Sequence, residues 1–171
     1  MKIHIIGCSG SGKTYLAEKI AKRYSIHHYD LDNIYWSDKE KFGTRRSEEE
    51  RTKILNDILL NNHWIIEGVY YEWLDDAFKD ADYILVLKTN KRICQYRVIK
   101  RFYKRKWQKY ENEAETLKSA INLAKWIDRF YDEAMPKIEE KLKPYHKKVI
   151  YLKNFKDVEQ LLSKTINTYR Y

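Results

Sequence analysis

The feature that most constrains the fold is the segment Gly7-Cys8-Ser9-Gly10-Ser11-Gly12-Lys13-Thr14, which follows an apolar run from Ile3 to Ile6. It fits the pattern G-x-x-x-x-G-K-[ST], whose glycines let the backbone turn so that its N–H groups point inward at phosphate oxygens. Lys13 is then expected to reach the β- and γ-phosphates, and the Thr14 hydroxyl to bind Mg²⁺. We call residues 7–14 the phosphate cradle. Its expected nucleotide-binding residues are Gly7, Ser9, Gly10, Ser11, Gly12, Lys13 and Thr14.

A glycine turn that binds no ligand is the alternative, because short patterns recur by chance. The context favours the cradle, since the motif works between a strand and a helix. A β-branched run precedes it and a helical pattern follows at once, formed by Leu16, Ala17, Ile20, Ala21 and Tyr24. The positive N-terminal end of that helix would add to the anion site. We therefore expect ATP and Mg²⁺ as ligands.

Apolar runs alternate with helical patterns along the chain. The expected strands are 3–6, 26–29, 64–66, 83–87 and 148–152. Helical patterns follow the cradle, start at the N-cap residue Ser47, cover about 71–78, start again near Asn90, run from 111 to 142 with a break at Pro136, and cover 157–166. The alternation predicts an α/β fold, a three-layer sandwich with a parallel sheet that binds ligands at the carboxyl ends of its strands. The length of 171 residues fits a single domain over 1–171.

The composition predicts a cytoplasmic protein. A charged fraction of 35% and a mean hydropathy of -0.77 predict no membrane span, and a first strand at the N-terminus leaves no room for a secretory leader. Cys8 and Cys94 have no metal-ligand spacing, and the five histidines show none either. We therefore expect a reducing compartment and no structural zinc.

Acidic residues follow the second and third expected strands. Asp30 and Asp32 lie where a strand gives way to a loop, and two residues apart in an extended segment they would point to the same side. One would hold a Mg²⁺-bound water, for which we expect Asp30 beside Thr14, and the other would accept a proton from an acceptor hydroxyl. A turn carboxylate or helix N-cap is the alternative. Glu67-Gly68 would border the acceptor, with Glu67 near Mg²⁺ or simply closing the strand.

Arginines are expected to surround the transferred phosphate. Arg97, Arg101 and Arg105 recur every four residues and share one helical face, which suits charge that spreads over a transferring phosphoryl group. We expect Arg97 and Arg101 to be catalytic, and Arg101 and Arg105 to contact the nucleotide. A solvated basic face is the alternative.

The acceptor side is expected in residues 33–46, interpreted as a loop or lid-like insert. Arg45 and Arg46 would clamp the acceptor's anionic group, and Trp36 would form a wall of its pocket beside Tyr35. Packing alone is the alternative role for these aromatic rings.

The segment from Lys88 to Lys109 holds ten basic residues and no acidic one, in a chain of net charge +9. Such a patch attracts polyanions, and both nucleotide phosphates and nucleic-acid backbones qualify. Its interleaved aromatic residues could stack on bases. Weak, non-specific DNA binding through residues 88–109 is therefore the second hypothesis. The aromatic residues are Tyr96, Phe102, Tyr103, Trp107 and Tyr110.

With these residues assembled, the chain resembles the P-loop (Walker A) nucleoside and nucleotide kinases, a group that includes adenylate, shikimate and gluconate kinases. Asp30-Leu31-Asp32 resembles the D-x-D of shikimate kinases, and Arg46 with Glu49 resembles their F-R-x-x-E element in spacing only. More narrowly, the chain is similar to the DNA topology modulation proteins, relatives of adenylate kinase. The segments that carry this likeness are residues 31–36, 64–70, 97–101 and 125–127.

The resemblance implies a five-stranded sheet in the order 2-3-1-4-5, MgATP on the cradle and γ-phosphoryl transfer to a small nucleotide, nucleoside or other hydroxyl acceptor. It also implies an acceptor site between the Asp30 and Arg46 regions and a helical lid over about 97–135. The name of the narrower family implies an effect on DNA. Those relatives usually read D-G-N-Y where this chain has Glu67-Gly68-Val69-Tyr70.

A GTPase is the other nucleotide-binding class to weigh. Asn90-Lys91-Arg92-Ile93 begins like the guanine-reading N-K-x-D but has Ile93 in place of the aspartate, and no D-x-x-G follows the third strand. The sequence therefore favours ATP.

Overall fold

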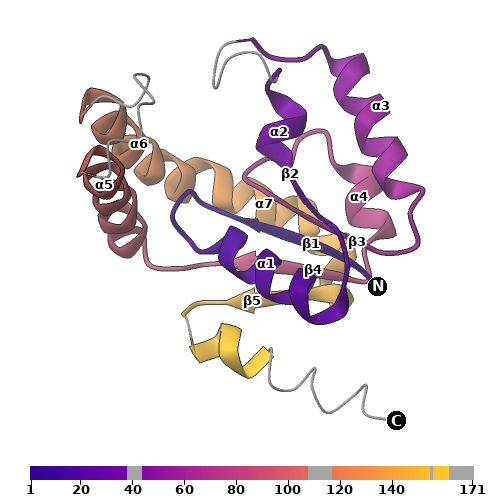
Figure 1. Ribbon diagram of the computed structural model, residues 1–171. Helices are drawn as coiled ribbons and strands as arrows, with labels where there is room; N and C mark the ends of the chain where they lie inside the picture. The colour runs from indigo at the N-terminus through magenta and orange to yellow at the C-terminus, as the bar shows by residue number, and fades with distance from the viewer. Residues whose placement is uncertain (38–43, 108–116, 155, 162–171) are drawn as a thin grey trace.

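A five-stranded parallel sheet forms the centre of the protein. The structure, a computed structural model, describes residues 1–37, 44–107, 117–154 and 156–161 (Figure 1). The sheet order is β2-β3-β1-β4-β5, with every neighbouring pair parallel, which confirms the predicted α/β fold and strand order. The strands are β1 (Lys2–Gly7), β2 (His28–Asp30), β3 (Trp64–Gly68), β4 (Tyr83–Leu87) and β5 (Val149–Leu152).

Helices connect the strands and cover both faces. They are α1 (Lys13–Tyr24), α2 (Leu31–Tyr35), α3 (Glu48–Leu59), α4 (Asp75–Asp80), α5 (Lys91–Trp107), α6 (Leu117–Arg129) and α7 (Met135–Leu142). A π-helical turn, Phe130–Ala134, joins α6 to α7, and a 3₁₀ helix, Lys143–Lys148, leads into β5. At the break expected at Pro136, the π-helical turn passes directly into α7, and the proline lies in the first turn of that helix.

Successive side chains of a strand point to opposite faces of the sheet, and each face is covered by its own layer of helices. Ile3 and Ile5 of β1 pack on one face with Leu16 and Ile20 of α1, in a cluster that also includes Val158 of the helical segment 156–161. Ile6 faces the other way, into a cluster with residues of α3, α4 and α7. Figure 1 shows α1 and the 156–161 segment on one side of the sheet and α3, α4 and α7 on the other.

Strand register brings the predicted site residues together. Asp30 pairs with Glu67 across β2 and β3, and Glu67 pairs with Ile5 across β3 and β1. Because β1 leads directly into the cradle, both carboxylates lie at its edge of the sheet. The convergence expected at the carboxyl ends of parallel strands is thus observed.

Two local expectations were wrong. Residues 31–35 form helix α2, so Asp30 and Asp32 do not lie in one extended segment, and residues 33–35 are not loop. The predicted alternative holds instead: Asp30 is the N-cap of α2, and its Oδ1 accepts a 2.9 Å hydrogen bond from the N–H of Asp32. The rest of the expected insert is described only in part, with Trp36 bridged to Arg45 in antiparallel fashion and residues 38–43 outside the described residues.

Among the helices of the described ranges, none is both long and apolar enough to cross a membrane.

Candidate functional site

The cradle has the backbone geometry that its glycines predict. Gly10 and Gly12 adopt positive φ angles of 77° and 105°, a conformation that residues with a side chain rarely adopt. The N–H of Ser11 donates to the carbonyl of Cys8 over 3.2 Å, and Nζ of Lys13 donates to that carbonyl over 3.1 Å. The buried Ser11 hydroxyl has no partner among the described residues. An unpaired buried hydroxyl in a turn shaped by two glycines of positive φ fits an oxygen-rich ligand.

Glu67 lies next to the two chemically active residues of the cradle. Its Oε1 accepts a 2.6 Å hydrogen bond from the Thr14 hydroxyl, and its Oε2 lies 3.9 Å from Nζ of Lys13. Nε2 of His28 lies 3.8 Å from Oε1. Burial by itself raises the pKa of Glu67, but His28, the charge on Lys13 and the Thr14 hydrogen bond outweigh it and lower the pKa. Glu67 is therefore an ionised carboxylate, only 2% exposed, at the edge of the cradle.

Asp30 and Asp32 have different surroundings. Burial raises the pKa of Asp30, although the N–H of Asp32 partly offsets this. Asp32 instead accepts a 3.0 Å hydrogen bond at Oδ1 from the hydroxyl of Tyr70. The Tyr70 ring stacks on Tyr35 with centroids 4.4 Å apart and an interplanar angle of 17°. Asp32 is thus exposed yet held in place by a packed aromatic residue.

Close packing against Leu31 explains why residue 68 is a glycine. A Cβ atom at this position would lie 2.7 Å from both Cβ and Cδ1 of Leu31, closer than real Cβ contacts come. Leu31 is fully buried in the first turn of α2. The glycine therefore lets α2, with Asp32 on it, sit directly against the end of β3.

The acceptor-side arginines differ in what they contact. Nη1 of Arg46 donates to the carbonyls of Asn33, Ile34 and Trp36, at the C-terminal end of α2. Arg46 thus satisfies carbonyls that have no partner within the helix. The exposed guanidinium of Arg45 lies over the rings of Tyr35 and Trp36, at 5.6 and 5.9 Å from their centroids.

The arginines of α5 differ in a similar way. Nη1 of Arg97 donates to the carbonyls of Gly10 and Ser11, at 3.2 Å each, so this arginine lies against the cradle. Arg101 follows one turn later and is exposed. The side chain of Arg105 falls outside the described residues. The structure therefore brings Arg97 to the cradle.

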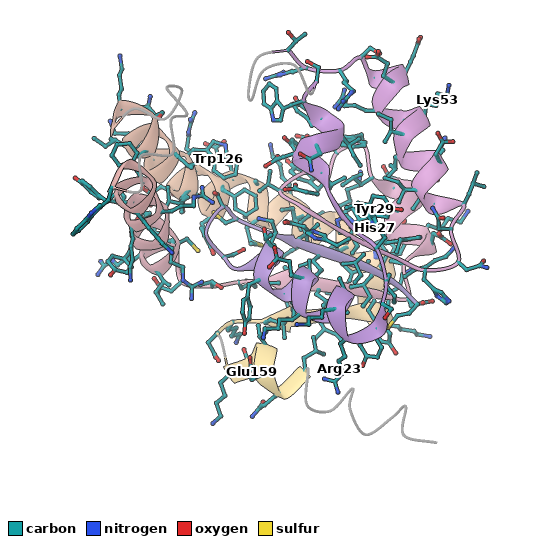
Figure 2. The ribbon with its side chains drawn as sticks, in the orientation of Figure 1. Arg23, His27, Tyr29, Lys53, Trp126 and Glu159 are labelled. Atoms are coloured by element: carbon teal, nitrogen blue, oxygen red, sulfur yellow. The ribbon has the colours of Figure 1, made fainter. Side chains whose placement is uncertain are left out.

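Helices α5 and α6 pack against each other and are joined by hydrogen bonds. Nε2 of Gln95 donates to the carbonyl of Ala124 and to Oδ2 of Asp128, at 3.1 and 3.0 Å. Figures 1 and 2 show the two helices side by side, with Trp126 labelled on α6. The Trp126 ring packs on Phe130 with centroids 5.2 Å apart. Part of the expected lid, residues 108–116, lies outside the described residues.

Three further residues of the site, which no sequence pattern indicated, contact residues that were predicted. His28 faces Glu67, Tyr70 holds Asp32, and the buried Thr89 hydroxyl donates to the carbonyl of Ser11 over 3.0 Å. Each of the three lies within two residues of a strand's carboxyl end, which is the signal that could have found them. Asn90 has a structural role, because its Oδ1 accepts from the N–H of Arg92 at the start of α5.

Comparison with known proteins points to nucleotide-binding folds. A family model described as an AAA domain matches residues 3–118. The uncharacterized protein YqaC of Bacillus subtilis (strain 168) is 36% identical over 112 residues, which are 65% of this chain. The match spans 60% of that relative, less than two thirds of its length.

Solved structures of kinases share the fold. A shikimate kinase from Acinetobacter baumannii, in complex with shikimate, superposes with a TM-score of 0.61 at 14% identity, covering 99% of this chain and 95% of the other. A deoxyadenosine kinase from M. mycoides with bound dATP gives a TM-score of 0.51 at 14% identity, covering 98% and 100%. At 14% sequence identity, this structural similarity supports a shared fold and nothing about function. Because the family model covers most of the chain, this protein belongs to the AAA domain family.

Proposed function

We propose that the protein is a kinase that transfers the γ-phosphoryl group of MgATP to a small acceptor, a nucleotide, a nucleoside or another small hydroxyl compound. The observation that carries this proposal is the ionised Glu67 carboxylate, within 2.6 Å of the Thr14 hydroxyl and 3.9 Å of the Lys13 ammonium. Asp32 lies in α2, directly after the neighbouring strand β2, where an acceptor hydroxyl would contact it. ATP is the proposed donor because the aspartate of a guanine-reading motif is replaced by Ile93.

The residues present fit a magnesium nucleotide. The glycine turn of the cradle and its unpaired Ser11 hydroxyl suit phosphate oxygens, and Lys13 supplies the positive charge. Mg²⁺ typically takes only one or two protein oxygens and keeps water and phosphate as its other ligands, and Thr14 with Glu67 offers such a pair. We assign the carboxylate role to Glu67 in place of Asp30, because Glu67 contacts the Thr14 hydroxyl directly, whereas Oδ1 of Asp30 accepts the N–H of Asp32 as the cap of α2. When bound, Mg²⁺ neutralises charge on the phosphates.

The remaining roles follow from position. Asp32 accepts the proton of the acceptor hydroxyl, because it is exposed and Tyr70 fixes its carboxylate without burying it. Arg97, already against the cradle, stabilises charge on the transferred group. Arg101 keeps its proposed catalytic and nucleotide-binding role, and the nucleotide contact expected of Arg105 stays a prediction from the four-residue spacing. Lys13 contacts the phosphoryl oxygens once it leaves the Cys8 carbonyl.

The acceptor is proposed to lie beside α2. Gly68 and Asp32 form its floor, and Tyr35, Trp36 and Arg45 form a wall whose guanidinium suits an anionic group. Arg46 supports this wall through the carbonyls of α2. Shikimate and deoxyadenosine, suggested by the structural neighbours, represent two classes of acceptor to test.

A ligand screen tests this function. Thermal unfolding is followed with MgATP, with each candidate acceptor, and with acceptors plus a non-hydrolysable ATP analogue, because a ligand of the folded state raises the melting temperature. MgATP is expected to stabilise the wild type but not Lys13→Ala, while Lys19→Ala, an exposed lysine on the same helix, behaves as wild type. Absence of any MgATP effect on the wild type overturns the proposal.

Nucleic-acid binding is the second candidate, favoured by one observation. Three aromatic rings on the basic helix α5 are strongly exposed, with Tyr96 at 63%, Tyr103 at 57% and Trp107 at 90%. Exposed rings among lysines and arginines suit stacking on bases. The segments 31–36 and 64–70, which resemble DNA topology modulation proteins, support the same candidate.

A salt series on duplex and single-stranded DNA tests this candidate. Reversal of charge at Lys100 and Lys104 should weaken binding and flatten its salt dependence, because fewer counterions are released. Lys53→Glu on α3, labelled in Figure 2, is the matched control and should bind as the wild type does. Equal binding by the α5 variant and this control would exclude α5 as the interface.

A further inference from the structure

The only two cysteines of the chain meet behind the phosphate cradle. Cys8 is the second residue of the cradle, and Cys94 lies in the first turn of α5. Both are free thiols and fully buried, and each is the hydrogen-bond partner of the other. Two segments far apart in sequence thus place a pair of oxidisable sulfur atoms in contact.

The cradle and α5 are packed tightly at this point. A Cβ atom on Gly10 would lie 2.7 Å from the carbonyl oxygen of Cys94, so the backbones approach as closely as glycine allows. The Thr89 hydroxyl donates to the carbonyl of Ser11, and the Arg97 guanidinium donates to the carbonyls of Gly10 and Ser11, so residues before and after Cys94 in sequence are bonded to the cradle. The sulfur pair therefore lies inside an existing junction, and a bond between the two sulfurs would make that junction covalent.

The surroundings give the two thiols different roles. The hydrogen bond with Cys8 lowers the pKa of Cys94 against the opposing effect of burial, with help from the Tyr131 hydroxyl and the charge of Arg97. The same contact, together with burial, raises the pKa of Cys8. The proposal below therefore gives Cys94 the role of nucleophile and Cys8 the role of the thiol that resolves its oxidised form.

We propose that Cys8 and Cys94 are a redox modification site, at which a hydroperoxide produces a reversible disulfide that fastens the phosphate cradle to α5. The Cys94 thiolate attacks the terminal peroxide oxygen and breaks the O–O bond, which leaves Cys94 sulfenic acid and, with hydrogen peroxide, one water after protonation. Cys8 then loses its proton and attacks the Cys94 sulfur, and the hydroxyl leaves as a second water. Two thiols lose two electrons and one peroxide gains them.

The disulfide would fix the cradle relative to α5 in the arrangement that the structure shows. In that arrangement Lys13 donates to the carbonyl of Cys8 and Arg97 to those of Gly10 and Ser11. Phosphate binding requires Lys13 to leave that carbonyl, and a tethered Cys8 resists the accompanying backbone shift. The predicted loss of MgATP affinity rests on the proposed function, whereas the disulfide and its effect on the cradle do not.

The test uses the full-length protein, reduced and then treated with hydrogen peroxide. Peptide mapping without reductant should show Cys8 linked to Cys94, with loss of two hydrogen masses that a thiol reductant restores. Amide hydrogen exchange should slow in residues 8–14 and 91–98 of the linked form, because their junction can no longer open. MgATP should bind at least about tenfold more weakly after oxidation.

Cys94→Ser is the control, since it leaves the cradle sequence intact, and Cys94→Ala replaces it if the serine variant does not fold. Neither should show slower exchange or weaker binding after peroxide. Oxidation of the wild type without a Cys8–Cys94 link, or a link that leaves exchange unchanged, overturns the proposal. If the reduced protein does not bind MgATP, the proposed function fails, and the mapping and exchange results still decide the fate of the disulfide.

Discussion

The Thr14 hydroxyl donates a 2.6 Å hydrogen bond to Oε1 of Glu67, and this bond joins the cradle to the neighbouring strand β3. Thr14 is the second residue of α1, and Glu67 is the penultimate residue of β3, 53 residues further along the chain. The two side chains contact each other directly, because β1, which leads into the cradle, lies beside β3 and parallel to it. The central proposal depends on this pair, and the predictions below start from it.

Replacing Glu67 with glutamine should remove its charge while retaining an acceptor for Thr14. Turnover should fall roughly 10²-fold or more, the scale for loss of one electrostatic stabiliser, and the Mg²⁺ concentration needed for half-maximal activity should rise. Steady-state kinetics over a Mg²⁺ series measure both. Asp57→Asn, at an exposed site on α3, is the control and should match the wild type. Wild-type Mg²⁺ dependence in Glu67→Gln would remove Glu67 from the metal site.

Tyr70→Phe removes the hydroxyl that donates to Asp32 over 3.0 Å and keeps the ring that stacks on Tyr35. One lost hydrogen bond to a charged group should lower kcat/KM for the acceptor roughly tenfold, with KM for ATP unchanged. Tyr71→Phe, the next residue along the chain, is the matched control. An equal change in both variants would mean that Asp32 needs no such support.

Gly68→Ala should be destabilising, because its Cβ would meet Leu31 at 2.7 Å. We expect a loss of about 1–3 kcal/mol in the free energy of unfolding, measured in urea. In a double-mutant cycle with Leu31→Ala, the two losses should not add, since the smaller side chain makes room for the new methyl group. Strict additivity would show that the two residues do not meet.

The buried His4 predicts a pH dependence of stability. Burial lowers the pKa of His4 from 6.5 to about 3, although the charge on Glu67 opposes this, and both ring nitrogens lack a partner among the described residues. Below pH 6.5 the His4 imidazole of the unfolded chain binds a proton, whereas that of the folded protein stays neutral down to about pH 3. The contribution of neutral His4 to the free energy of unfolding is therefore complete above pH 6.5 and is lost as the pH falls toward 3.

The expected loss is about 1.4 kcal/mol per pH unit over that range, from this one group. Urea unfolding at pH 7, 6 and 5 measures it. His4→Phe, whose ring can still pack on Phe78, should have a shallower slope than the wild type, and the exposed-site variant His146→Gln should not. The same slope in His4→Phe would assign the pH dependence to other groups.

The sequence predicted the layout of the fold because its signals are local. The unbroken apolar run Ile84-Leu85-Val86-Leu87 suits only a buried strand, and Ser47 followed by three glutamates marks a helix start, observed as a capping box between Ser47 and Glu50. The strand order itself came from the resemblance to kinases, since periodicity does not say which strands pair.

The site was predictable where a motif fixes the backbone and less so where tertiary contacts decide. Asp30 caps a helix that the D-x-D spacing does not reveal, and Nη1 of Arg46 donates to the carbonyls of α2, which no spacing rule indicates. Glu67 was expected either near Mg²⁺ or simply closing its strand, and only the structure shows its hydrogen bond with Thr14. The contact between Cys8 and Cys94 depends on how α5 packs, and no spacing rule links the two cysteines.

Phosphoryl transfer itself is the most direct test of the central claim. Release of ADP from MgATP is measured with a panel of nucleosides, nucleotides and small hydroxy acids, and the phosphorylated product is identified by mass. The account predicts that at least one acceptor is phosphorylated by the wild type and by Lys19→Ala, and that Lys13→Ala loses roughly 10²-fold or more of that rate. Equal rates in Lys13→Ala and the wild type, or no transfer to any acceptor on the panel, would contradict it.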